Sequence, residues 1–322
     1  MIKGICLARR AIGLGLVLLL FAGAAQAQFL GAHTAGDFGV NAATQPDPGD
    51  YVSALYFGYD GDSIRDKNGN VIEYPGGGGD LTVNAYALGW WHVSEAKLWG
   101  GNYSFMIWPA VTDNKLEIPV LGQSQKVSTG LTDLYVQPIN LGWHTDRIDY
   151  SAGLGLYLPT GSYTAGADDN RGLGMWTVEV SGGATVWLDE AKTWSFSTLA
   201  FFETHSEKED TDVRVGNILT VEGGLGKAFM GGLVNLGVAY YAQWKVSDDD
   251  LGDFVPPGDL NFVGKNSGYG IGPDVTLPLM SKSKLYGTVN ARYLWESGVQ
   301  SSVEGQMLWL TFTFMVPPLA LN

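Results

Sequence analysis

Charged and amide side chains recur on one side of alternating, strand-like segments of this chain. In 148–158, Asp149 lies opposite the apolar Ile148 and Tyr150, and in 233–246, Lys245 lies opposite Val238. Successive side chains of a strand point to opposite faces, so a strand in a membrane wall separates a lipid face from an interior face. The residues expected on the interior face, as candidates for a solute path, are Asp133, Gln137, Asp149, Glu179, Glu203, Arg214, Glu222, Lys245, Asp274 and Arg292.

The elements that would position these side chains are strand-like segments joined alternately by short polar turns and longer polar loops. The segments are 51–60, 81–92, 98–108, 131–144, 147–159, 173–188, 193–205, 213–228, 233–246, 265–279, 284–296 and 303–316. This rhythm and an even strand number are typical of bacterial outer-membrane barrels. The sequence therefore predicts an all-β fold, a transmembrane antiparallel up-and-down β-barrel of about 12 strands over 51–316, with a C-terminal tail at 317–322.

Two interpretations of the interior charges stay open. Rings of charge in a pore select the solutes that pass. In a narrow barrel, charges can instead pair with one another and seal the lumen. Residues 28–50 are polar and contain Pro46 and Pro48. Inside the lumen they would be a plug, whereas in the periplasm they would be a tether.

The first residues predict export. Lys3, Arg9 and Arg10 are basic, 11–21 is apolar, and small residues precede Ala27. This pattern is a signal peptide over 1–27, cleaved after Ala27, because its apolar run is too short to span a bilayer. The one cysteine of the chain precedes the apolar run. The mature chain therefore has no disulfide and no thiolate site.

Composition agrees with a barrel in the outer membrane. The chain is 12% aromatic and has 11 tryptophans, most of them near the ends of the predicted strands. Indole rings favour the headgroup region, so the tryptophans predict two interfacial girdles. The signal peptide holds three of the 19 basic and none of the 33 acidic residues, which leaves a mature net charge of −17. Such an acidic protein is not expected to bind nucleic acid.

Enzyme chemistry is not expected, nor is a cofactor or a metal site. The mature chain has His33, His92, His144 and His205, and His205 is followed by Ser206 at an outer strand end. No acid or oxyanion arrangement of a hydrolase accompanies that pair.

The expected partners are the lipid bilayer, lipopolysaccharide and a small-molecule solute. Two acidic loop clusters, Asp168-Asp169 and Asp248-Asp249-Asp250, are predicted to lie on the outer side. Such clusters are usually solvated surface, and they could alternatively hold divalent cations shared with lipopolysaccharide.

The central hairpin resembles a known family. Its residues run Gly130-Leu131-Thr132-Asp133-Leu134-Tyr135-Val136-Gln137-Pro138, then Leu141-Gly142-Trp143, and then Gly153-Leu154-Gly155-Leu156-Tyr157-Leu158-Pro159-Thr160-Gly161. They resemble the outer-membrane family named for the MetA pathway of phenol degradation, whose members are described as transporters. The resemblance implies an outer-membrane channel or transporter for small, hydrophobic or aromatic solutes. The alternative is a structural or adhesion barrel with a sealed lumen.

Overall fold

The computed structural model describes residues 30–72, 80–118, 123–167, 169–253, 265–282 and 284–320. The predicted signal peptide over 1–27 therefore lies outside the described residues, as do Asp168 and the last two residues of the predicted tail. No helix within the described ranges is long and apolar enough to cross a membrane.

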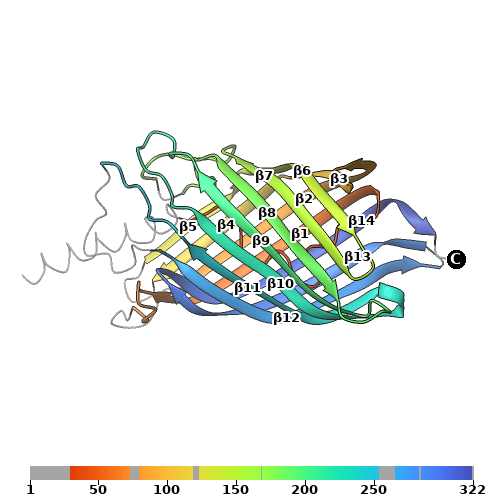
Figure 1. Ribbon diagram of the computed structural model, residues 1–322. Helices are drawn as coiled ribbons and strands as arrows, with labels where there is room; N and C mark the ends of the chain where they lie inside the picture. The colour runs from red at the N-terminus through yellow and green to blue at the C-terminus, as the bar shows by residue number, and fades with distance from the viewer. Residues whose placement is uncertain are drawn as a thin grey trace, which may run out of the picture.

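The strands form one closed antiparallel barrel (Figure 1). They are β1 Gly49–Arg65, β2 Asp80–Leu98, β3 Gly101–Trp108, β4 Ala110–Ile118, β5 Gln123–Leu131, β6 Leu134–His144, β7 Ile148–Leu158, β8 Thr177–Trp187, β9 Trp194–His205, β10 Ile218–Phe229, β11 Val234–Lys245, β12 Ser267–Ser281, β13 Lys284–Gln300 and β14 Ser302–Ala320. The barrel closes because β1 pairs with both β2 and β14.

Two of the barrel's strands are each built from two shorter pieces. Pro109 separates β3 from β4, and both pieces pair with β2. Thr132 and Asp133 separate β5 from β6, which pair with β4 and β3 respectively. A proline has no N–H for the hydrogen-bond ladder, so it interrupts the strand, while both pieces still pair with the same neighbouring strand. When each of these two pairs of pieces is counted as one strand, the barrel has twelve strands, and the predicted fold class is confirmed.

Two predicted boundaries are wrong. Residues 109–130 were expected as a long loop, but β4 and β5 extend through most of this range and pair from Val111 and Leu131 outward. The tail expected at 317–322 is strand as far as Ala320, which pairs with Lys284. Both stretches lack a clean apolar and polar alternation, because they lie at the ends of strands where the two faces differ less in environment.

The two faces of the wall have opposite chemistry. Val180 and Val238 are exposed on the outer face, whereas their strand neighbours Glu179 and Ala239 are fully buried on the inner face. The outer face is therefore the apolar surface that a bilayer would cover. Trp309 points inward and is only 5% exposed, and Trp187 also points inward, where its Nε1 donates to Asp149 at 3.2 Å.

Residues 30–48 have no regular strand or helix, and they lie inside the barrel, where they contact the inner faces of β7 to β13.

A lysine placed on the outer face should destabilise the barrel. Val238 is 47% exposed and pairs with Leu225 and Pro273 near the middle of the wall. We expect Val238→Lys to lower the free energy of unfolding by about 2–4 kcal/mol in lipid, because the charge would lie near the bilayer midplane. Urea titration of protein in vesicles, followed by heat-modifiable gel mobility, measures this loss.

The matched control for this substitution is Asp248→Lys in an outer loop, where the native side chain is 87% exposed. This variant should unfold as the wild type does. Equal stability of Val238→Lys and the wild type would show that this face is not in contact with lipid.

Candidate functional site: the barrel interior

The N-terminal segment, residues 30–48, crosses the interior along the barrel. Its first residues contact Glu203, which lies near the outer end of β9. Its last part contacts Asp149, the second residue of β7, and Ser104 at the same short-turn end of the barrel. The chain then enters β1 at Gly49. The predicted plug or tether region therefore lies within the lumen wherever the structure describes it.

Two glutamates of the wall hold the backbone of this segment. Oε1 of Glu203 accepts the N–H groups of Ala32 and His33 at 2.8 and 2.9 Å. Glu222 accepts those of Gly36 and Phe38 at 3.0 and 2.7 Å. Both carboxylates are fully buried. An irregular segment has no ladder partners, so these charge-assisted bonds satisfy N–H groups that would otherwise be costly to bury.

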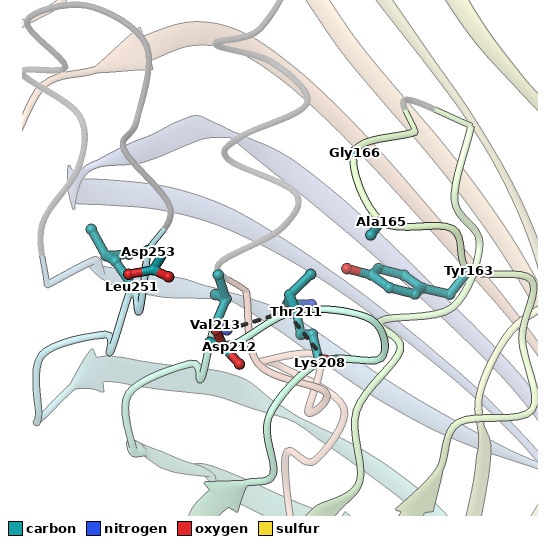
Figure 2. A pocket seen from close by; sticks show the side chains of 9 residues that line it. All are labelled: Tyr163, Ala165, Gly166, Lys208, Thr211, Asp212, Val213, Leu251 and Asp253. Atoms are coloured by element: carbon teal, nitrogen blue, oxygen red, sulfur yellow. Dashed lines mark hydrogen bonds between the residues drawn. The ribbon is translucent and has the colours of Figure 1, made fainter.

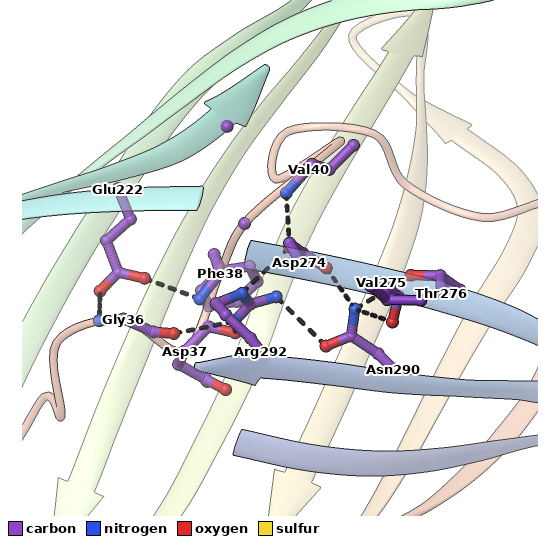
Figure 3. Close-up of polar contacts among 12 residues, drawn as sticks. Gly36, Asp37, Phe38, Val40, Glu222, Asp274, Val275, Thr276, Asn290 and Arg292 are labelled. Atoms are coloured by element: carbon purple, nitrogen blue, oxygen red, sulfur yellow. Dashed lines mark hydrogen bonds and ion pairs between the residues drawn. The ribbon is translucent and has the colours of Figure 1, made fainter. Parts of the chain in front are cut away.

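An ion pair on the neighbouring strands holds the next residues (Figure 3). Oδ2 of Asp274 accepts the N–H of Val40 at 2.9 Å and Nε of Arg292 at 3.0 Å. Nη1 of Arg292 donates to the carbonyls of Gly36 and Asp37 at 2.8 and 2.6 Å. The carboxylate of Asp274 thus accepts from the segment and the guanidinium of Arg292 donates to it. Because both charges are paired and hydrogen-bonded, they are tolerated inside the barrel.

Glycine is required where the segment passes this pair. A Cβ on Gly39 would collide with the carboxylate of Asp274 and come within 2.5 Å of Nε of Arg292. Gly36 has φ +87°, a conformation that side chains rarely adopt, and it packs against Leu294. The segment therefore approaches the wall as closely as a bare backbone allows.

His33 links the segment to two strands at once. Its Nδ1 lies 2.9 Å from Glu179 and its Nε2 lies 2.7 Å from Glu222, and its ring stacks on Phe201 at 4.2 Å. Burial lowers the pKa of His33, but the charges of Glu222 and Glu179 outweigh it and raise the pKa well above the ordinary 6.5. Both ring nitrogens face carboxylates, so the ring binds best as an imidazolium.

The wall binds the carbonyl of Asp37 through Arg292 but not its carboxylate. Its carboxylate has no hydrogen-bond partner among the residues that the structure describes. Burial and the charge of Glu222 raise the pKa of Asp37 to about 6, although His33 and Arg292 oppose this rise. Its ionised form is therefore disfavoured inside the lumen.

Most of the predicted interior residues do face inward, and many of them contact the segment. Glu179, Glu203, Glu222, Asp274 and Arg292 are described above, and Asp149 accepts a bond from Oγ1 of Thr44 at 3.1 Å. Gln137 is buried at the irregularity of β6, beside Gly153. The structure thus brings these residues together around residues 30–48 and not around an open ring.

Three of the predicted residues lie elsewhere. Arg214 lies in the loop before β10, is about half exposed and pairs with Glu207, so its expected interior position is wrong. The sequence pattern predicted a strand from residue 213, but the strand begins only at Ile218, so Arg214 lies in a loop. Lys245 does lie on the inner face, at the end of β11 and only 3% exposed, but it binds Asp249 of the outer loop at 2.9 Å.

Asp133 binds an outer loop. Its carboxylate accepts the N–H of Gly161 at 3.0 Å and that of Leu173 at 2.7 Å. Thr160 also contacts this strand, since its Oγ1 accepts the N–H of Leu134 at 3.0 Å. The residues that carry the family resemblance therefore fasten the loop between β7 and β8 to the break between β5 and β6.

An apolar cluster lies beside the segment, on the inner faces of β1, β2, β11, β13 and β14, and Ala35 of the segment packs against it. Phe57, Leu294, Met307 and Trp309 form a buried cluster there, with Phe57 and Trp309 in ring contact at 4.5 Å. Leu55, Val83 and Ala85 extend this cluster on the inner face and are only half-buried. Alternation in 51–60 was too weak to predict this apolar wall from the sequence.

The comparisons with known proteins agree with this architecture. The family model described as "Putative MetA-pathway of phenol degradation" matches residues 61–312. The chain belongs to this family. The predicted family resemblance is thus confirmed, and it extends well beyond the central hairpin. No curated protein matches the chain.

One solved structure shows the same fold. The COG4313 outer membrane channel from Pseudomonas putida F1 has a TM-score of 0.70 and 13% identity, over 88% of this chain and 99% of that chain. A FadL homologue from Pseudomonas aeruginosa has a TM-score of 0.42 and 10% identity, over 83% and 90%. The first match confirms the predicted bacterial outer-membrane barrel at the level of the fold.

The contact of His33 predicts a pH dependence of the segment. Its raised pKa stabilises the docked segment fully below pH 6.5, and this contribution is lost as the pH rises through the raised value. A spin label on Thr34→Cys, the sole cysteine of the mature chain, reports the mobility of the segment by EPR. We expect the label to become more mobile in alkaline buffer.

The control is the same label in His33→Gln, which cannot form the imidazolium. Its mobility should be higher at pH 6 and should change little with pH. An identical pH profile in both proteins would contradict the assigned role of His33.

Proposed function

We propose that this protein is an outer-membrane channel for small, neutral, hydrophobic or aromatic solutes, and that it is not an enzyme. The observation that carries the proposal is the half-buried apolar surface on the inner faces of β1 and β2, beside the charged residues that bind the segment. The charged residues Glu203, Glu222 and Asp274 bind residues 30–48. Ala35 and Gly36 of the segment cover part of the apolar cluster, and its half-buried residues Leu55, Val83 and Ala85 form the inner surface suited to a solute.

The half-buried residues of the apolar wall set the solute class. Leu55, Val83 and Ala85 point inward and keep part of their surface accessible there. An apolar solute that covers such surface gains about 25 cal/mol per Å². A charged solute would lose its hydration without finding a partner on this wall.

Trp309 adds one polar group to this wall. Its Nε1 is buried and has no hydrogen-bond partner among the described residues. An unpaired buried donor is costly, so an acceptor oxygen of a solute would be favoured there where Gly36 of the segment gives way to it. Together with the apolar neighbours, this N–H supports aromatic solutes with one oxygen as well as pure hydrocarbons.

The geometry at His205 supports the absence of hydrolase chemistry. Its Nδ1 contacts the carbonyl of Val215 at 3.2 Å, and its Nε2 lies 3.7 Å from Glu203. Oγ of Ser206 donates to the carbonyl of Glu207 at 2.8 Å. The serine and the histidine therefore have separate partners and form no nucleophile and base pair.

A second candidate function is a structural barrel with a sealed lumen. Its support is the segment itself, since the buried charges of the wall are largely occupied by residues 30–48. Lipid and lipopolysaccharide would be the main partners in either case.

Filling the apolar wall should block uptake. We expect Ala85→Phe to reduce entry of radiolabelled toluene several-fold in cells that lack other uptake barrels, because the added ring occupies the inner surface. The matched control is Ala54→Phe, since Ala54 lies on the outer face between Leu88 and Phe312 and should leave uptake unchanged. Heat-modifiable mobility confirms that both variants fold.

The sealed barrel predicts a different outcome. Uptake by cells with the wild-type protein would then equal that of cells without it, and neither phenylalanine would matter.

A further inference from the structure

A pocket lies among the outer loops, apart from the lumen (Figure 2). Its volume is about 280 Å³, and residues of the loops after β7, β9 and β11 line it. Tyr163, Val213 and Leu251 give it apolar walls, and the buried Lys208 contributes the one ammonium of its lining. A pocket of this size suits one small molecule with a single ring.

Asp133, one of the residues that carry the family resemblance, supports the pocket from outside its lining. Asp133 binds the N–H of Leu173, and Nζ of Lys208 donates to the carbonyl of the same residue at 2.6 Å. Asp133 also binds Gly161, two residues before Tyr163. One carboxylate at the break between β5 and β6 thus fixes the positions of both the lysine and the aromatic ring.

The ring of Tyr163 packs against Gly174, where a side chain would leave no room for it. Gly174 adopts φ +64°, and a Cβ there would collide with the ring of Tyr163. Nζ of Lys208 lies 5.4 Å from the centre of this ring. The ammonium and the ring therefore face the same small space, with the apolar Val213 and Leu251 in contact with each other at its side.

The ammonium of Lys208 has more N–H donors than the carbonyl that binds it can accept. An ammonium carries three N–H groups, and the carbonyl of Leu173 is the one acceptor of Lys208 Nζ within the described part of the chain. The residue is only 3% exposed. An acceptor oxygen of a ligand would therefore satisfy a buried charged donor, which is worth more than a neutral hydrogen bond.

The surroundings favour a neutral ligand over an anion. Asp212 and Asp253 lie at the pocket, and their carboxylates oppose a second negative charge. Burial lowers the pKa of Lys208 to about 8, so most of the ammonium stays charged near neutral pH and can donate to an oxygen of the ligand.

We propose that this outer pocket is a binding site for a neutral monocyclic aromatic compound with one acceptor oxygen, such as a phenol, with its ring against Tyr163 and its oxygen on Lys208. Binding itself does not depend on transport. Delivery of the bound compound to the lumen rests on the proposed function.

Fluorine NMR of para-fluorophenol with the folded full-length protein tests the binding. We expect Lys208→Met to weaken the Kd about tenfold, because a hydrogen bond to a charged donor is lost. Tyr163→Leu should weaken it several-fold. Ala165→Trp, which fills the pocket without removing either group, should abolish binding.

The matched control is Lys192→Met. Lys192 likewise lies near a ring, 5.6 Å from that of Trp187, and donates to the carbonyl of Thr145 at 3.0 Å, but at the opposite end of the barrel. This variant should bind as the wild type does. The lumen variant Ala85→Phe should also keep the affinity of the outer pocket, even if it blocks uptake.

Two further probes define the ligand class. Para-fluorobenzoate should bind more weakly than para-fluorophenol because of the acidic rim, and 4-fluorocyclohexanol should bind more weakly because it lacks a π-face. Unchanged affinity in Lys208→Met, Tyr163→Leu and Ala165→Trp would overturn the site. Tighter binding of the benzoate would overturn the assigned class.

Discussion

The structure depends on the binding of an irregular backbone by buried carboxylates. Residues 30–48 have no strand partner, yet they lie inside a closed barrel. Their N–H groups are accepted by Glu203, Glu222 and Asp274. Backbone donors are as costly to bury unpaired as any polar group, so without these acceptors the segment would favour water over the lumen. Each carboxylate in turn needs donors, and the segment supplies them.

This mutual requirement divides the interior. The strands that contribute a carboxylate to the segment present that part of their inner face to its backbone. The strands near the barrel closure, β1, β2 and β14, contribute Phe57, Ala85 and Trp309 instead. A solute that needs no ionic partner is matched to this remaining wall. Under the proposed function, the charges of the interior serve the structure and its apolar residues serve selectivity.

The period of two along the strands predicted the barrel, its strand number and the inward direction of residues such as Glu179 and Asp274. This was possible because lipid and lumen impose opposite chemistry on alternate residues. The partners of those residues could not be predicted, since the conformation of 30–48 is set by contacts with strands that are more than a hundred residues away. Arg214 was misplaced because a loop can show the same alternation as a strand.

The central hairpin shows a second limit of the sequence. Asp133 looked like one more interior charge, whereas its carboxylate holds the backbone of Gly161 and Leu173 in an outer loop. A strand break beside the residue was the missing signal, because it frees an inward side chain to turn toward the outer end of the barrel. Charges in a barrel thus need their local backbone before they can be assigned a role.

Hydrogen exchange measured by mass spectrometry tests the docked segment most directly. In the folded protein, peptides that contain the amides of His33, Phe38 and Val40 should exchange as slowly as barrel strands do, since carboxylates bind these N–H groups. Gly39→Val, whose side chain would collide with Asp274, should abolish this protection and leave the strands protected. Exchange of these amides at unprotected rates in the wild type, beside protected strands, would contradict the account.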